Sequence, residues 1–310
     1  MAFTAQDVAK LREMTGAGMM DCKKALTAMD GDMEKAGEYL REQGIAVAAK
    51  KGGRIASEGV VAASVCGCGT CGALVEINSE SDFVAKSPDF VKLCNDIAKA
   101  AESANPRDLD ALNAAKTGDV TVAGLITRGT ATIGEKLSLR RFVRQEIACG
   151  REEAYIHMGG KIGVLLEIAT GKDLNKDAEF VSMCHDIAMH VAAIDPKFVY
   201  ESEVPAEIIA KETEIIKAQL FNEPSNKNKP EAVLEKIAAG KMKKYFKENC
   251  LVEQEYVKDN TVSVGAFVEA NAKKFGTAIK IVRFTKFIMG EGLEKKSDNL
   301  AEEVAKMQNK

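Results

Sequence analysis

The side chains that most often carry chemistry are few in this chain, and their densest group is a set of three cysteines. Cys66, Cys68 and Cys71 fall within six residues and are separated by glycines and a threonine. Thiolates at such a spacing could begin a zinc site, but a structural zinc site needs four ligands in paired spacings, and no second pair follows nearby. We therefore expect reduced thiols at the tip of a turn, with zinc as the less favoured alternative.

The histidines and glycines do not indicate a catalytic or nucleotide-binding site either. His185 and His190 are five residues apart, whereas a helical zinc pair has a spacing of four. Gly16-x-Gly18 lacks the third glycine of a dinucleotide-binding loop, and the sequence has no Gly-x4-Gly-Lys-Ser/Thr phosphate loop. No local signature pairs a nucleophile with a base, although residues distant in sequence could still meet in space. We predict a protein that is not an enzyme and that has no metal and no cofactor.

The composition excludes further classes of function. The 310 residues include 43 Lys and Arg against 46 Asp and Glu, a net charge of −3. Binding of nucleic acid by bulk electrostatics requires concentrated basic residues, so we expect no direct nucleic-acid binding. No uncharged apolar run approaches the roughly 20 residues that cross a bilayer, and residues 1–7 lack the basic and apolar regions of a leader peptide. We expect a cytoplasmic protein without membrane contact, whose eight cysteines are reduced.

Helix signals dominate the first 55 residues. Thr4 and Asp7 form a capping box for a first helix, a second is expected over residues 19–28, and residues 30–32 cap a third that ends at Gly44. The basic residues of 46–54 then indicate a mobile linker. We interpret residues 1–55 as a three-helix bundle and linker that resemble a ubiquitin-associated (UBA) module.

The pattern after residue 55 alternates between strands and helices and contains an internal repeat. Strands over residues 60–65 and 73–77 form a hairpin around the three cysteines. The segment 90–98 resembles 180–188 at an offset of 90 residues, and each copy follows a strand and runs on to a proline. A spacing of 90 is too long for a solenoid repeat, so we predict two related α+β core subdomains.

The predicted fold is therefore α+β, with a helical insertion in its second half. Residues 203–220 and 231–247 are amphipathic helices joined by a proline-containing turn, which indicates an antiparallel, coiled-coil-like hairpin. A partly alternating strand is expected over 277–288, followed by a C-terminal helix that Ser297 and Asp298 begin. The predicted units are residues 56–147 for the first core subdomain, 148–197 plus 249–292 for the second, 198–248 for the hairpin and 293–310 for the C-terminal helix.

Two loops stand out beside these elements. In the segment 78–85, Asp82 directly precedes the large aromatic side chain of Phe83 in a polar connection from strand to helix. Taken alone, these residues favour a Phe83 that packs as a lid on its own core. The segment 155–163 is a glycine-rich approach to a strand, which is typical of a hairpin turn with positive φ angles.

Several motifs resemble a known family. The block Thr15-Gly16-Ala17-Gly18-Met19-Met20-Asp21-Cys22-Lys23-Lys24-Ala25-Leu26 closely resembles the N-terminal signature of the elongation factor Ts family. Ser81-Asp82-Phe83-Val84-Ala85 resembles the family's Thr-Asp-Phe-Val-Ala loop, with Ser81 in place of the usual threonine. Further motifs follow in the family's order at 133–135, at the His157 segment, at 240–244 and at 290–295. The resemblance covers essentially the whole chain.

The resemblance implies a guanine-nucleotide exchange factor that promotes GDP release from elongation factor Tu by disturbing its Mg²⁺ and phosphate site. By similarity, the loop that would displace Mg²⁺ comprises Ser81, Asp82, Phe83 and Val84, so the resemblance reverses the lid interpretation and implies an exposed Phe83. The partner-binding positions that it implies are Arg12, Met19, Met20, Ile133, Gly134 and His157.

The implied partner is elongation factor Tu in its GDP-bound and nucleotide-free states. The assemblies that we consider are a homodimer of this chain and a two-to-two complex with the partner. The alternative is a non-enzymatic adaptor that uses the UBA-like bundle and the helical hairpin as interaction surfaces.

Overall fold

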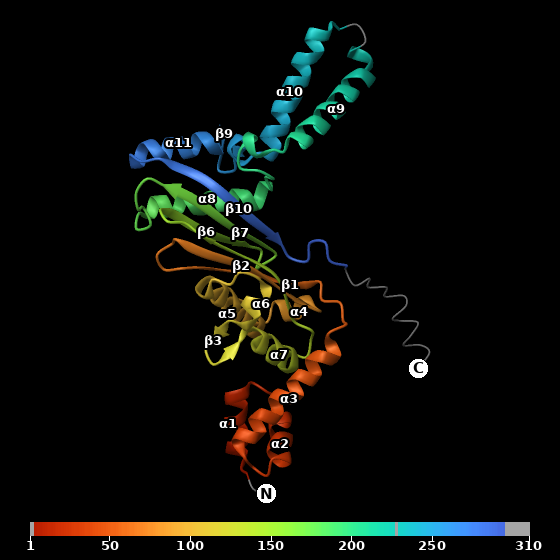
Figure 1. The fold of residues 1–310 in the computed structure, drawn as a ribbon, viewed down its shortest axis with the longest axis vertical. Helices are drawn as coiled ribbons and strands as arrows, with labels where there is room; N and C mark the ends of the chain where they lie inside the picture. Colours follow the sequence, from red (N-terminus) through yellow and green to blue (C-terminus); the bar gives the residue numbers. More distant parts are fainter. Residues whose placement is uncertain (1–2, 227–228, 295–310) are drawn as a thin grey trace.

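The computed structural model describes residues 3–226 and 229–294. It is an α+β structure, as predicted, and it is elongated, with the N-terminal helices at one end, two sheets in the middle and a helical hairpin at the other end (Figure 1). The predicted C-terminal helix falls on residues 293–310, which lie outside the described residues from residue 295 on. Within the described ranges, no helix is long and apolar enough to span a membrane.

The N-terminal bundle consists of α1 (Ala5–Thr15), α2 (Met19–Ala28) and α3 (Met33–Lys51). The capping box is confirmed, since the Thr4 hydroxyl accepts from the Asp7 backbone N–H at 3.3 Å and the Asp7 carboxylate accepts from the Thr4 backbone N–H at 2.7 Å. Asp32 caps α3 as predicted. The three helices bury a small apolar core of Val8, Leu11, Cys22, Ala25, Leu26 and Ala36.

The predicted end of the third helix at Gly44 is wrong, and so is the mobile linker over 46–51. The α3 helix continues to Lys51, because its second half packs on the core helix α7 (Val122–Ile133). Gly44 is buried, and a Cβ built on it would lie 3.5 Å from the Ala131 side chain. That distance is ordinary van der Waals contact, so the packing of α3 on α7 keeps this part of the chain helical and outweighs the roughly 1 kcal/mol cost of glycine in a helix. Only residues 52–57 connect α3 to the first strand.

Two three-stranded antiparallel sheets form the centre of the molecule. The first has the order β1 (Glu58–Val65), β2 (Cys71–Ser79), β5 (Ser138–Glu146), and the second β10 (Ile279–Ile288), β7 (Ile162–Thr170), β6 (Gly150–His157). The strands β1, β2 and β10 confirm the predicted ones. The shorter elements of this region are α6 (Leu109–Ala114), β3 (Lys116–Thr117), β4 (Val120–Thr121), β8 (Glu255–Tyr256), β9 (Asp259–Ser263) and α11 (Val264–Phe275).

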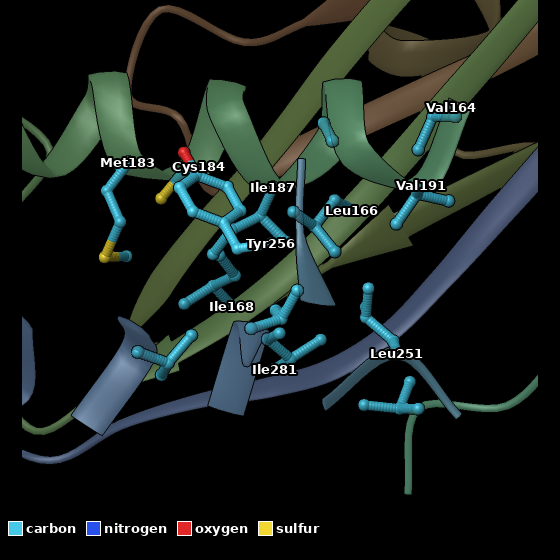
Figure 2. Close-up of a cluster of buried hydrophobic side chains, with 14 of the residues drawn as sticks. Val164, Leu166, Ile168, Met183, Cys184, Ile187, Val191, Leu251, Tyr256 and Ile281 are labelled. Atoms are coloured by element: carbon cyan, nitrogen blue, oxygen red, sulfur yellow. The ribbon is translucent and has the colours of Figure 1, made fainter. Parts of the chain in front are cut away.

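The two helices of the repeat lie on the outer faces of these sheets. α5 (Pro88–Ala104) packs on the first sheet and α8 (Ala178–Ile194) on the second, and both have 17 residues. The inner faces meet through Val61 and Leu74 of one sheet and Leu165 and Phe287 of the other. Figure 2 shows the core under α8, where helix residues such as Ile187 meet Leu166 and Ile168 of β7. The result is four layers, helix, sheet, sheet, helix, so β2 is buried on both faces.

The predicted helical hairpin is present as α9 (Ala206–Asn222) and α10 (Glu231–Asn249), and it projects from the body beyond α8 (Figure 1). Short 3-10 turns stand before, within and after it: Glu201–Glu203, Pro224–Asn226 and Leu251–Glu253. Ile216 and Leu220 are its buried residues within the described part of the two helices. Most of its surface is solvent-exposed.

One buried carboxyl group, that of Glu152, forms no ion pair among the residues that the structure describes. Glu152 of β6 lies directly opposite Glu167 of β7, and Arg283 binds Glu167 at 2.6 Å. Both carboxyl oxygens of Glu152 are buried and have no hydrogen-bond partner within residues 3–226 and 229–294. Burial, and then the neighbouring Glu167, raises the pKa of Glu152 to about 9. Glu152 is therefore neutral at physiological pH.

Glu152→Gln is expected to increase the free energy of unfolding by at least about 1 kcal/mol at pH 8. The unfolded chain releases the Glu152 proton near pH 4.5 while the folded chain keeps it to about 9, so wild-type stability falls as the pH rises between these values. Glutamine carries no such proton. Urea unfolding at pH 5, 7 and 8.5 should show a smaller decline for the variant, and identical pH profiles would contradict this.

Candidate functional site

Three turns meet at one end of the two sheets and form the candidate site. The first is the loop after β2, which contains the short helix α4 (Asp82–Ala85); the second is residues 134–137, after α7; the third is residues 158–161, between β6 and β7. The third turn lies close to the first because both contact Glu58 at the start of β1. Glu58 pairs with Ser79 at the end of β2, and its carboxylate binds Lys161 of the third turn at 2.8 Å.

The loop after β2 presents an exposed aromatic ring. Ser81 caps α4, since its hydroxyl accepts from the Val84 backbone N–H at 3.3 Å. Val84 packs against the core under α5 and Ala85 is buried, which turns the preceding residue outward. Phe83 is 83% exposed. The lid interpretation from the residues alone is therefore wrong, and the exposure that the resemblance implied is confirmed.

Asp82 places a negative charge beside this ring. Its carboxylate binds Lys86 at 2.6 Å, one helical turn further on. The hydrogen bond from Lys86, supported by the charge of Lys161, holds the pKa of Asp82 below its usual range. Asp82 is thus ionised at physiological pH, and the loop combines an anion with an apolar anchor.

Glu135 holds the loop in place, a role that sequence reasoning missed. Its carboxylate accepts from the backbone N–H groups of Glu80 at 3.0 Å and Ser81 at 2.9 Å, and from the Ser81 hydroxyl at 2.6 Å. In return, the Glu80 carboxylate accepts from the Lys136 backbone N–H at 2.6 Å. The only sequence signal was the position of Glu135 directly after Ile133 and Gly134, whereas its partners are more than 50 residues away in sequence.

The predicted contact residues of the core lie in or beside the other two turns. Gly134 ends α7 with a φ of 87°, which only glycine adopts at little cost, and its carbonyl accepts from Lys51 at the end of α3. Ile133 is half-buried against the core under α5. His157 is exposed at the end of β6, where its Nδ1 lies 3.1 Å from the Tyr155 hydroxyl. The adjacent glycines at 159 and 160 have positive φ, as predicted for this turn.

The other predicted contact residues lie on the N-terminal bundle and do not join the loop. Arg12, Met19 and Met20 are all exposed, the two methionines by 45% and 62%. The bundle connects to the loop region through α3, which packs on α7. The predicted residues thus belong to two parts of the molecule, the N-terminal bundle and the core, which Figure 1 shows one after the other along its length.

The histidines and the other side chains that can ligate a metal ion are the candidates for a metal site. Among residues 3–226 and 229–294, no group of three His, Cys, Asp or Glu side chains could hold a metal ion. His190 is buried, its Nε2 lies 3.0 Å from the Gln254 side-chain oxygen, and burial lowers its pKa. His185 is half-exposed and lies 3.2 Å from Glu153. The site consists of exposed side chains on the loop after β2, which the hydrogen bonds to Glu135 hold in place.

Comparison with known proteins gives a consistent result. The family model described as "Elongation factor TS" matches residues 80–291. A protein named elongation factor Ts from Trichlorobacter lovleyi is 45% identical over 309 residues, covering 98% of each chain. Its namesake from Clostridium perfringens strain SM101 is 46% identical over 309 residues, covering 99% of this chain and 100% of the relative. A third, from Symbiobacterium thermophilum, is 46% identical over 304 residues, covering 97% of each. The chain therefore belongs to the elongation factor Ts family of translation elongation factors.

Proposed function

We propose that this protein is the guanine-nucleotide exchange factor for elongation factor Tu, acting in the cytoplasm. The observation that carries the proposal is the 83% exposed ring of Phe83 on a loop that Glu135 holds rigid. Burial of an exposed aromatic side chain by a partner removes apolar surface from water, and such aromatic anchors dominate the energetics of protein interfaces.

The mechanism needs no covalent chemistry. A GTPase holds GDP through backbone amides around the phosphates and a bridging Mg²⁺. Insertion of Phe83 beside that site, with the ionised Asp82 next to it, would displace the groups that hold Mg²⁺ and so weaken GDP binding. Ser81 and Val84 shape the loop. Arg12, Met19 and Met20 of the bundle and Ile133, Gly134 and His157 of the core would add contacts that orient the partner.

Thermodynamic linkage makes this action reversible. If the factor lowers the affinity for GDP by some ratio, GDP lowers the affinity for the factor by the same ratio. The factor should therefore bind both GDP-bound and nucleotide-free elongation factor Tu, and excess nucleotide should displace it.

Release of a fluorescent GDP analogue from purified elongation factor Tu tests the proposal. Catalytic amounts of this protein should accelerate release strongly, and excess GDP should remove it from immobilised elongation factor Tu. Failure to bind, or binding that is insensitive to GDP and leaves release unchanged, would favour the adaptor and contradict exchange.

Glu135→Gln is expected to slow stimulated GDP release roughly 5- to 30-fold. A charged acceptor that serves two backbone N–H groups and a hydroxyl becomes a neutral amide that can accept at one atom only, a loss of about 1–2 kcal/mol in loop anchoring. Stopped-flow measurement of release should show the loss, with the circular dichroism spectrum unchanged.

Glu179→Gln is the matched control for this change. Glu179 of α8 also binds a partner through its carboxylate, Lys274 at 2.7 Å, but lies in the second core half. Equal effects of the two substitutions, or full activity of Glu135→Gln, would show that Glu135 does not position the loop.

A further inference from the structure

The three cysteines that the proposed function leaves unused lie together at the tip of the β1–β2 hairpin. The sulfurs of Cys66 and Cys68 are 2.8 Å apart, and the Cys71 backbone N–H donates to the Cys66 sulfur at 3.1 Å. Cys68 is exposed, and Cys66 and Cys71 are half-buried. A disulfide bond is 2.03–2.05 Å long, so an approach of about 0.8 Å would join Cys66 to Cys68.

The turn around these sulfurs can accommodate such an approach. One residue, Gly67, separates the two cysteines, and a Cβ built there would meet no atom within 4 Å. The strands on either side are held by the backbone, since the Cys66 backbone N–H donates to the Cys71 carbonyl at 2.9 Å. The tip can therefore adjust without disturbing the register of β1 and β2.

The surroundings favour ionisation of one thiol. Burial opposes it, but hydrogen bonds from Cys68, from Cys71 and from the Cys71 backbone lower the pKa of Cys66 to about 6. Burial, and then the neighbouring Cys66, raises the pKa of Cys71 to about 11. The charged and titratable groups around the cluster are Lys99 and Glu102 of α5, Arg144 and Glu146 of β5, and Arg151 and Glu152 of β6.

The cluster differs from the other cysteines of the chain. Cys22, Cys94, Cys184 and Cys250 are buried, and Cys149 is exposed, with its sulfur 3.9 Å from the Thr170 hydroxyl. The cluster thus combines three properties: the sulfurs of Cys66 and Cys68 are in contact, Cys68 is accessible to solvent, and the thiolate form of Cys66 is favoured. Together these properties define a reactive dithiol.

We propose that Cys66 and Cys68 form a redox-active dithiol that reacts reversibly with small disulfides of the glutathione class. The Cys66 thiolate attacks one sulfur of the small disulfide, whose S–S bond breaks and releases one thiolate, which takes a proton. The Cys68 thiol then loses its proton to solvent, and its sulfur attacks the Cys66 sulfur of the mixed disulfide and releases the second small thiol. Two electrons pass from the protein dithiol to the small disulfide.

Incubation of the reduced full-length protein with glutathione disulfide tests the proposal, with an acid quench, alkylation and intact mass measurement. Wild type should lose two hydrogen atoms and two alkylation sites and retain no glutathione at the tip. Cys68→Ser should keep one glutathione on Cys66, Cys66→Ser should react at least tenfold more slowly at the tip, and Cys71→Ser should behave as wild type. Cys149→Ser is the matched control, because it removes an exposed cysteine outside the cluster.

The pH dependence tests the environment of Cys66. The rate for the folded protein should level off above about pH 7, whereas the rate for protein unfolded in urea should keep rising toward the pKa of a free thiol, near 8.5. The proposal is overturned if Cys66→Ser reacts as fast as wild type, if Cys71→Ser rather than Cys68→Ser blocks closure, or if folded and unfolded protein share one pH profile.

Discussion

Phe83→Ala is expected to slow stimulated GDP release from elongation factor Tu by roughly 30-fold while leaving the fold intact. Truncation of an aromatic anchor at a protein interface costs about 2 kcal/mol or more, and every 1.4 kcal/mol is a factor of ten. The ring is 83% exposed, so its removal leaves no cavity in the free protein. The loss should therefore appear in exchange kinetics and not in the free energy of unfolding.

The chain offers a matched control for this change. Phe221 of α9 is 85% exposed, so Phe221→Ala removes an equally accessible ring from the helical hairpin, away from the proposed site. Stopped-flow traces with a fluorescent GDP analogue should separate the two variants clearly. Equal activities of the two variants, or unchanged exchange by Phe83→Ala, would refute the proposed insertion of Phe83 beside the Mg²⁺ site.

Glu76→Ala is expected to lower the free energy of unfolding by about 3–5 kcal/mol, the usual cost of removing one partner from a buried ion pair. Glu76 of β2 has no exposed surface and points between the two sheets. Its carboxylate accepts from Arg140 at 2.9 Å, Arg141 at 2.6 Å and the Gly290 backbone N–H at 2.9 Å. Without it, the buried Gly290 N–H loses its acceptor, and the two guanidinium groups keep, among the described residues, only their hydrogen bonds with Ile288 and Glu291.

Urea unfolding at pH 7 and at pH 3 provides the measurement and a second readout. Burial alone would raise the pKa of Glu76, but the hydrogen bonds from Gly290, Arg140 and Arg141 lower it below its ordinary value. A lowered folded-state pKa means that the stabilisation is present above pH 4.5 and is lost as the pH falls through the folded-state value. The difference between wild type and Glu76→Ala should therefore shrink in acid.

Glu146→Ala is the control for this substitution. Glu146 of β5 binds Arg144 at 2.8 Å but is 60% exposed, so its removal should cost less than about 1 kcal/mol. A cost for Glu76→Ala as small as that for Glu146→Ala would show that the buried network does not hold the sheets together.

Local signals in the sequence predicted most of the secondary structure correctly. The capping box at Thr4, the cap at Asp32 and the prolines at 106 and 196 gave helix ends to within a few residues, because caps act over three or four residues. The end of α3 could not be predicted in this way. It depends on the packing of the second half of α3 on α7, which begins 71 residues after α3 ends.

The candidate site shows the same division between local and distant determinants. The polar loop after β2 was visible in the sequence, but the direction of Phe83 was not, because a one-turn helix can turn an aromatic residue inward or outward. Its outward direction follows from the packing of Val84 and Ala85 and from the anchor at Glu135. Similarly, the alternation over residues 74–77 predicted a strand, but nothing local indicated that Glu76 faces a second sheet.

The contact between Glu76 and Gly290 also limits when the protein can mature during synthesis. These two residues are 214 positions apart in the sequence. The hydrogen bonds to Glu76 of β2 are therefore complete only when Gly290, near the end of the described residues, has been synthesised. Arg140 and Arg141 leave the ribosome about 150 residues before Gly290, which corresponds to roughly 8–30 s at ordinary rates of translation. During that interval the first sheet has its guanidinium groups, but the opposing sheet lacks β10 and the turn that contains Gly290. A nascent chain arrested before residue 290 should therefore remain sensitive to protease at β2, even though the loop after β2 has been fully synthesised.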